Sequence, residues 1–198
     1  MNTEELIANL VEAPRAPGRA AALLLLPLIW GNTGRIEAAI LRPMFWAKVM
    51  LPASMTLAAL WTAARLSQPG VKVGRAWLAL GLPVALVAVA AALVLATAPP
   101  GARAGLLLGH TWRTCSLYIA GLSMPALAVL LHAMRGLAAT RPVAAGRVAG
   151  LLAGAIGTLV YCLRCPETAV PFWALWYLVG MGVPALAGGL LGPRVLRW

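Results

Sequence analysis

Apolar runs of about 20 residues recur along this chain of 198 residues, and they constrain its fold more than any other feature. Coiled as a helix, a run of that length crosses a hydrocarbon core of roughly 30 Å. Hydrophobic residues make up 62% of the sequence and charged residues only 11%, which excludes an ordinary soluble globular domain. The sequence therefore predicts an integral membrane protein built from helices.

Six runs have the required length, and together they predict an all-α membrane protein that forms a six-transmembrane-helix bundle. A signal peptide has basic residues at the very start of the chain and a small-residue cleavage site. Both are missing here, so we expect the first run to be retained rather than removed. Residues 1–19 would form a cytoplasmic segment ahead of a transmembrane domain at 20–198. The expected spans are Ala20–Ile40, Phe45–Ala64, Ala76–Ala98, Cys115–Met134, Val143–Tyr161 and Val170–Leu191.

The distribution of lysine and arginine predicts the orientation of these spans. Ten of the sixteen basic residues fall on the side of the N-terminus, so both termini are expected in the cytoplasm. The net charge of +11 comes from single residues at the ends of the runs, which membrane topology explains without direct binding to nucleic acid.

Small residues and prolines within the runs suggest a tightly packed bundle. Gly146, Gly150 and Gly154 recur every four residues, a spacing that lets two helix backbones approach closely. A similar set occupies the last run: Gly180, Gly188 and Gly192. Prolines inside five runs remove helical hydrogen bonds that neighbouring helices must help restore, and we interpret both features as structural. These prolines are Pro27, Pro52, Pro83, Pro125 and Pro184.

The first fourteen residues predict a short amphipathic helix. Thr3 is a suitable N-cap, Glu4 and Glu5 suit the first turn, and Pro14 ends the pattern. A helix this short is marginal in water and needs a surface to lie on. Because its polar face is acidic, a basic protein partner suits it better than anionic lipid. Its apolar face consists of Leu6, Ile7, Leu10 and Val11.

The cysteine residues form a second group of candidate functional residues. Cys115 and Cys165 are expected in two loops on the same outward face, with Cys162, His110 and Glu167 close by in the sequence. Cys115 and Cys165 could close a disulfide in an oxidising periplasm. Together with Cys162 and His110 they also offer ligands for zinc, cadmium or cuprous copper.

Two further interpretations apply to the same cysteines. A thiol near Arg113 or Arg164 would have a lowered pKa and would be open to oxidation. Alternatively, the cysteines are small, well-packed apolar residues without reactivity. The residues alone leave disulfide, metal site, oxidant sensor and simple packing open.

Enzyme chemistry finds little support in the sequence. The chain has five carboxylates, three of them in the leader, and Glu37 and Glu167 are too isolated for paired acid and base catalysis. A phosphate-binding glycine loop, a zinc-protease HExxH and a serine nucleophile elbow are all missing from the sequence. We therefore expect a protein that is not an enzyme and requires no cofactor.

Several short motifs occur in an order and spacing that cover nearly the whole chain, and by these the chain resembles the NrsF-type membrane anti-sigma factors. These proteins are negative regulators of a sigma-F-like extracytoplasmic-function sigma factor. The motifs are the Thr-Glu-Glu-Leu-Ile start, Leu41-Arg-Pro43, Phe45-Trp-Ala-Lys48, Leu108-Gly-His-Thr-Trp-Arg-Thr-Cys115, Pro125-Ala-Leu, Thr140-Arg-Pro142, Cys165-Pro-Glu167, Pro171-Phe-Trp-Ala-Leu-Trp-Tyr177 and Leu191-Gly-Pro-Arg-Val-Leu-Arg-Trp198.

The resemblance implies a six-helix protein of the bacterial inner membrane whose cytoplasmic N-terminal segment holds a sigma factor inactive. It also implies that cysteines matching Cys115 and Cys165 take part in the response to heavy metals and oxidants. Cys162 matches no pattern of the family, and Met44 stands where the family commonly has Asp.

We therefore expect an anti-sigma factor that sequesters an extracytoplasmic-function sigma factor through its leader and releases it when Cys115 and Cys165 sense a soft metal ion or an oxidant. Its partners would be the sigma factor and the lipid bilayer, and the sequence leaves the oligomeric state open. Two rival functions are a soft-metal transporter and a membrane thiol oxidoreductase, although three cysteines cannot supply two redox-active pairs.

Overall fold

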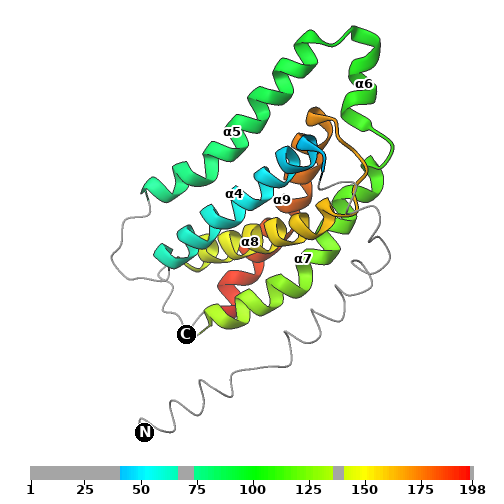
Figure 1. The fold of residues 1–198 in the computed structure, drawn as a ribbon. Coiled ribbons are helices and arrows are strands. Elements are labelled where there is room, and N and C mark those ends of the chain that lie inside the picture. Colours follow the sequence, from blue (N-terminus) through cyan, green and yellow to red (C-terminus); the bar gives the residue numbers. More distant parts are fainter. Residues whose placement is uncertain (1–40, 67–73, 136–140, 197–198) are drawn as a thin grey trace, which may run out of the picture.

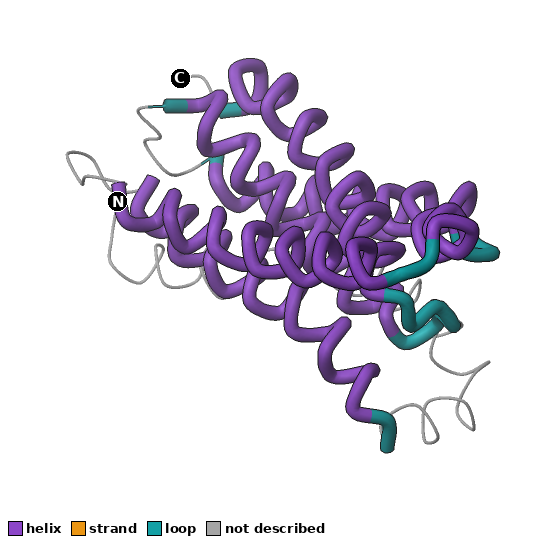
Figure 2. The backbone as a smooth tube through the Cα atoms, turned by 90° about the horizontal axis from the view of Figure 1, so that it is seen from above, coloured by secondary structure: helices purple, strands orange, loops and turns teal. Residues whose placement is uncertain are grey.

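The fold is a bundle of long helices, seen here in a computed structural model that describes residues 41–66, 74–135 and 141–196. Over these ranges the chain consists of helices and connecting loops, without a strand (Figure 2). The all-α fold predicted from the sequence is confirmed for this part of the chain. The helices are α4 (Pro43–Leu66), α5 (Gly74–Thr97), α6 (Pro100–Leu108), α7 (Trp112–Met134), α8 (Pro142–Cys162) and α9 (Val170–Val195).

Five of the expected spans correspond to helices, with ends that differ by a few residues. In the described ranges, five helical stretches are long and apolar enough to cross a membrane. They are α4, α5, the continuous α6–α7 stretch, α8 and α9. The expected first span, Ala20–Ile40, and the expected leader helix lie outside the described residues, so this part of the structure contains five candidate spans rather than six.

The expected spans Ala76–Ala98 and Cys115–Met134 left the residues between them as a loop, and the structure corrects this expectation. Residues Pro100–Leu108 form the helix α6, in which Pro100 occupies the first turn, where its fixed φ is compatible with a helix. The helix stops at Gly109, whose φ of +52° is open to glycine but rarely adopted by other residues. Pro99 precedes this helix, and Pro100 and Gly101 are its first two residues.

The centre of the bundle is α8, which packs closely against α9 (Figure 1). A Cβ atom added at Gly146 would collide with the backbone of Gly188, and one added at Gly150 would collide with the backbone of Pro184. At Gly154 the nearest atom to an added Cβ would be the Cα of Met181, only 2.9 Å away. The predicted close approach of backbones through small residues is therefore confirmed.

The helix α5 lies at the edge of the bundle and is the least buried of the five candidate spans (Figure 1). It exposes a row of large apolar side chains, the pattern of a helix whose outer side faces lipid. By contrast, α8 has no broad apolar face turned outward, because most of its residues contact α4, α7 or α9. The exposed residues on α5 include Trp77, Leu78, Leu82, Leu86, Val89 and Leu93.

The alternating direction of the helices brings four helix ends together. The starts of α4, α7 and α9 lie at the same end of the bundle as the finish of α8 (Figure 1). The loop of residues 163–169, which joins α8 to α9, covers this end. All three cysteines of the chain lie within these segments.

Candidate functional site

The three thiols are buried side by side at this end of the bundle. Cys115 lies in the first turns of α7, Cys162 is the last residue of α8, and Cys165 lies in the loop that follows. Their exposed fractions are 0%, 1% and 5%, and all three are free thiols. The expected convergence of the cysteines is therefore present, and Cys165 lies in a loop as expected, but Cys115 belongs to α7 and all three thiols are enclosed by helix packing.

The Cys115 thiol is hydrogen-bonded to the sulfur of Cys165, which links α7 directly to the α8–α9 loop. This contact lowers the pKa of the Cys165 thiol below its ordinary value, although burial acts in the opposite direction. The hydroxyl of Tyr177, the backbone of Glu167 and the charge of Lys48 lower the same pKa further. The pair thus combines a donor thiol with an acceptor sulfur that is stabilised as a thiolate, the form that reacts with oxidants.

Tyrosines enclose the thiols on the bundle side. Tyr161 stacks against Tyr118 with ring centroids 6.1 Å apart, and it meets Tyr177 edge to face at 6.2 Å. The Tyr177 ring is fully buried, and its hydroxyl lies against the sulfurs of Cys162 and Cys165. The buried Tyr161 of α8 and Tyr177 of α9 thus lie against the thiols, and Tyr118 of α7 contacts Tyr161 from the exposed side.

Lys48 is a charged residue of this site that the sequence prediction did not include. It lies near the start of α4 and is only 4% exposed. Its ammonium group donates a hydrogen bond of 2.6 Å to the backbone carbonyl oxygen of Cys165. The Cys162 sulfur lies 4.0 Å from the backbone carbonyl oxygen of Lys48. A single lysine inside an apolar run is the signal that points to such a residue, because an ionisable side chain there is usually functional.

The other predicted auxiliary residues are His110 and Glu167, and the side chain of Glu167 binds the backbone of His110, while only the backbone of Glu167 reaches a thiol, that of Cys165. The backbone N–H of His110 donates to Oε1 of Glu167 at 2.8 Å, while the His110 side chain is exposed. Nearby, Nε1 of Trp176 donates to the carbonyl oxygen of Leu107 at 2.8 Å. These bonds join the segment before α7 to α9 and to the loop before it. Within the three described ranges, no three His, Cys, Asp or Glu side chains are arranged to hold a metal ion.

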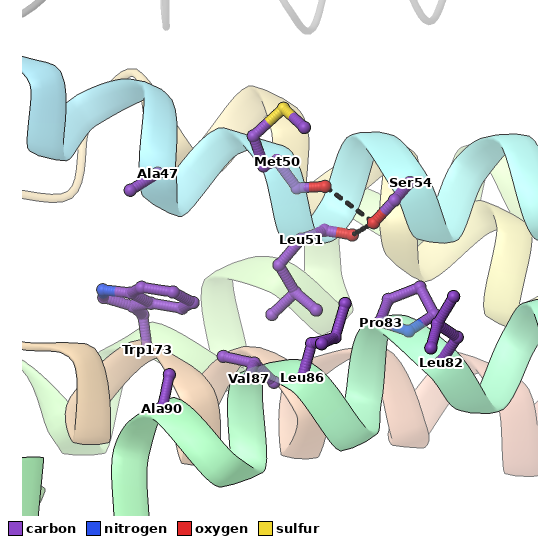
Figure 3. A pocket seen from close by; sticks show the side chains of 10 residues that line it. All are labelled: Ala47, Met50, Leu51, Ser54, Leu82, Pro83, Leu86, Val87, Ala90 and Trp173. Atoms are coloured by element: carbon purple, nitrogen blue, oxygen red, sulfur yellow. Dashed lines mark hydrogen bonds between the residues drawn. The ribbon is translucent and has the colours of Figure 1, made fainter. Parts of the chain in front are cut away.

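A pocket of about 340 Å³ between α4 and α5 is another candidate site (Figure 3). Its one hydroxyl, on Ser54, donates to the carbonyl oxygens of Met50 and Leu51 in its own helix, so the remaining wall is apolar. This lining offers space but no reactive group, so the thiol cluster remains the site with chemistry. The lining residues are Ala47, Met50, Leu51, Ser54, Leu82, Pro83, Leu86, Val87, Ala90 and Trp173.

The predicted partner-binding residues cannot be placed in this arrangement. Glu4, Glu5, Leu6, Ile7, Leu10 and Val11 all lie outside the described residues.

Comparisons with known proteins address the function of the chain as a whole. The family model described as "Negative regulator of sigma F", NrsF, matches residues 7–198. The chain is 44% identical over 213 aligned positions to the "Probable anti-sigma-F factor NrsF" of Azospira oryzae, and the match covers 100% of both chains. It is 39% identical over 183 positions to the "Anti-sigma-F factor NrsF" of Caulobacter vibrioides, which covers 91% of this chain and 85% of that one.

No solved structure matches the chain. The names of these relatives are those of regulatory proteins, as expected for a chain that is not an enzyme. The family suggested by the motifs is thereby confirmed across the whole length: the chain belongs to the NrsF family of negative regulators of sigma F.

Proposed function

We propose that this protein is an anti-sigma factor of the bacterial inner membrane, which holds an extracytoplasmic-function sigma factor through residues 1–19 and releases it when Cys115 and Cys165 are oxidised. Membership of the NrsF family and the two anti-sigma-F relatives support the regulatory role. Five apolar helices support the location in a membrane, with both termini cytoplasmic and the sixth span at Ala20–Ile40. The burial of the two thiols in one cluster, where Cys115 lowers the pKa of Cys165, is the observation on which the sensing role rests.

The proposed sensing reaction is a two-electron oxidation by a peroxide. The Cys165 thiolate attacks one peroxide oxygen, the O–O bond breaks, and the leaving hydroxide takes a proton to become water. Cys165 is then a sulfenic acid. The Cys115 sulfur attacks it, the S–O bond breaks, and the hydroxyl leaves as water with the proton of Cys115. Two thiols have become one disulfide, and the peroxide has been reduced to two waters.

The new bond would connect α7 covalently to the α8–α9 loop and change how α7, α8 and α9 pack. Moving a two-state equilibrium from about 1:99 to 99:1 takes about 5.5 kcal/mol. A disulfide contributes on the order of 2–4 kcal/mol, so its formation supplies a large part of the required bias. A soft metal ion is the other signal that suits two neighbouring thiols, and the experiment below separates the two signals.

The proposal is tested by capture of sigma factors. Full-length protein in detergent, and a variant that lacks residues 1–16, are each incubated with extracytoplasmic-function sigma factors from the same cell. We expect only the full-length protein to retain one. Retention by both forms would move the binding site away from the leader, and retention by neither would overturn the anti-sigma function.

The sensing part is tested on the same captured complex. Hydrogen peroxide or a cadmium salt is added to the wild type and to C115S, C165S and C162S variants. We expect peroxide to release the sigma factor from the wild type and from C162S only. Release by cadmium alone would identify a metal sensor, and normal release from C115S or C165S would remove the thiol pair from the mechanism. Metal flux into sealed vesicles would instead support a transporter.

A further inference from the structure

Lys48 presents a charge that the fold must balance. Its side chain is 4% exposed, and a buried ammonium group is costly unless a counter-charge or a full set of hydrogen bonds accompanies it. The carbonyl oxygen of Cys165, at 2.6 Å, accepts one of its three N–H bonds. The ring of Phe45, with its centroid 5.8 Å away, adds only a weak favourable contact.

Carboxylates do not balance this charge within the described residues. Glu167 is the one Asp or Glu residue in ranges 41–66, 74–135 and 141–196, and it accepts the backbone N–H of His110 instead. The groups that interact electrostatically with Lys48 are the thiols of Cys162 and Cys165. Of these two, Cys165 also supplies the carbonyl contact, so the ammonium group and the Cys165 sulfur belong to the same small site.

We propose that Lys48 is a positioning residue of the thiol sensor: its ammonium group holds the loop that carries Cys165 and balances the negative charge of the Cys165 thiolate. This inference rests on the proposed function, because it concerns the residue that prepares the sensing thiol for oxidation. Lys48 belongs to α4, a helix that carries neither of the two sensing thiols.

The arrangement also gives α4 a part in the response. When Cys165 enters a disulfide its sulfur loses the negative charge, and Lys48 becomes a buried cation without a counter-charge among the described groups. Because an unbalanced buried charge is costly, movement of the ammonium group toward water or toward another anion is then favourable. Its hydrogen bond to the Cys165 carbonyl oxygen opposes that movement. Oxidation at α7 and the α8–α9 loop would thus change the charge balance at Lys48 and the force on α4.

Other titratable groups face the same sulfur and are part of the expected pH response. Cys115 approaches from α7, Tyr161 and Cys162 from α8, and Tyr177 from α9, while Glu167 contributes its backbone from the loop. Of the groups that face the cluster, Lys48 is the one that carries a positive charge. Changing it therefore alters the charge at the sulfur without removing a thiol.

The test measures alkylation of Cys165 in reduced full-length protein. The wild type and the variants K48M and K48R are treated in detergent with iodoacetamide between about pH 5 and pH 9, and labelling of Cys165 is followed by peptide mass spectrometry. Burial slows labelling at every pH, whereas the midpoint of the pH profile reports the stability of the thiolate. We expect the midpoint in K48M to rise by about one pH unit, so that labelling at the wild-type midpoint falls about fivefold.

Two controls separate the effect of losing the Lys48 charge from the effect of a disturbed structure. K48R retains the positive charge and should keep its midpoint within a few tenths of a unit of the wild type. T62V removes another buried polar group from α4, far from the thiols, and should leave the midpoint unchanged while altering the packing of the helix. An unshifted K48M profile, or an equal shift in T62V, would overturn the inference.

The outcome is independent of the sigma-release experiment. A shifted profile in K48M, combined with normal peroxide release from C115S, would support the role of Lys48 and reject the sensing function. An unshifted profile, combined with loss of release in C115S and C165S, would reject the role of Lys48 and leave the sensing function standing.

Discussion

The backbone N–H of His110 donates to the carboxylate of Glu167 across 2.8 Å, and this bond joins the loop before α7 to the loop before α9. The two residues are 57 positions apart in the sequence. Cys115 follows the first loop by a few residues, and Cys165 lies within the second. The contact therefore holds together the two segments that carry the hydrogen-bonded thiols.

Replacing Glu167 by alanine should loosen this end of the bundle. The variant loses a charge-assisted hydrogen bond, a class worth about 1.5–3 kcal/mol, and because this bond is exposed we expect an effect no larger than the lower value. We expect faster hydrogen exchange at the His110 amide and little change in the middle of α8. T168A, a change at the exposed neighbouring residue, serves as the control, and unchanged exchange at His110 in E167A would contradict the assignment.

The reactivity of Cys165 should depend on pH in a direction set by Cys115. The Cys115 hydrogen bond lowers the pKa of Cys165, so its thiolate persists above this lowered pKa and is lost as the pH falls through it. In C115A that donor is missing, and we expect the alkylation midpoint to move up toward the ordinary thiol value of roughly 8.5. Iodoacetamide labelling against pH measures both midpoints, and equal midpoints would show that Cys115 does not stabilise the thiolate.

Oxidation should produce a single intramolecular disulfide between Cys115 and Cys165. Hydrogen peroxide added to the purified wild type should yield one linked peptide pair under non-reducing conditions. C162S should form the same pair, whereas C115S and C165S should form none. A disulfide that contains Cys162 in the wild type would instead identify a different sensing pair, since Cys162 is also buried in the cluster.

The glycine interface between α8 and α9 should tolerate no added atoms. In G150A the new methyl group meets the backbone of Pro184, and overpacking of this kind costs about 1–3 kcal/mol. At Gly182 nothing lies within 4 Å of an added Cβ atom, so G182A should be neutral or stabilising by up to about 1 kcal/mol. Thermal unfolding in the same detergent compares the two, and similar melting temperatures would contradict the close packing.

The length of the apolar runs and the spacing of small residues made most of the fold predictable. Five expected spans correspond to observed helices because a helix that presents about 20 apolar residues has few alternatives to burial or lipid. The glycine spacing on α8 also predicted its close contact with α9. Both predictions depend on the local sequence of one element, which is why they required no knowledge of its neighbours.

The boundaries between α5 and α7 were harder to predict. Pro99, Pro100 and Gly101 are turn residues in most settings, yet proline also suits the first turn of a helix. The sequence does not reveal which use applies. In the folded chain, α6 packs against α9, and that contact favours the helical alternative.

The sequence by itself determined the helical class, the membrane-length spans and the family, and it predicted that Cys115 and Cys165 converge. Only the tertiary structure decided that these thiols are enclosed, that Cys115 donates to Cys165, and that Lys48 reaches Cys165 from α4. The physical reason is distance along the chain, since Lys48 and Cys165 lie 117 residues apart. The hydropathy of a segment predicts only the environment of that segment. The contact between Lys48 and Cys165 depends instead on how whole helices pack.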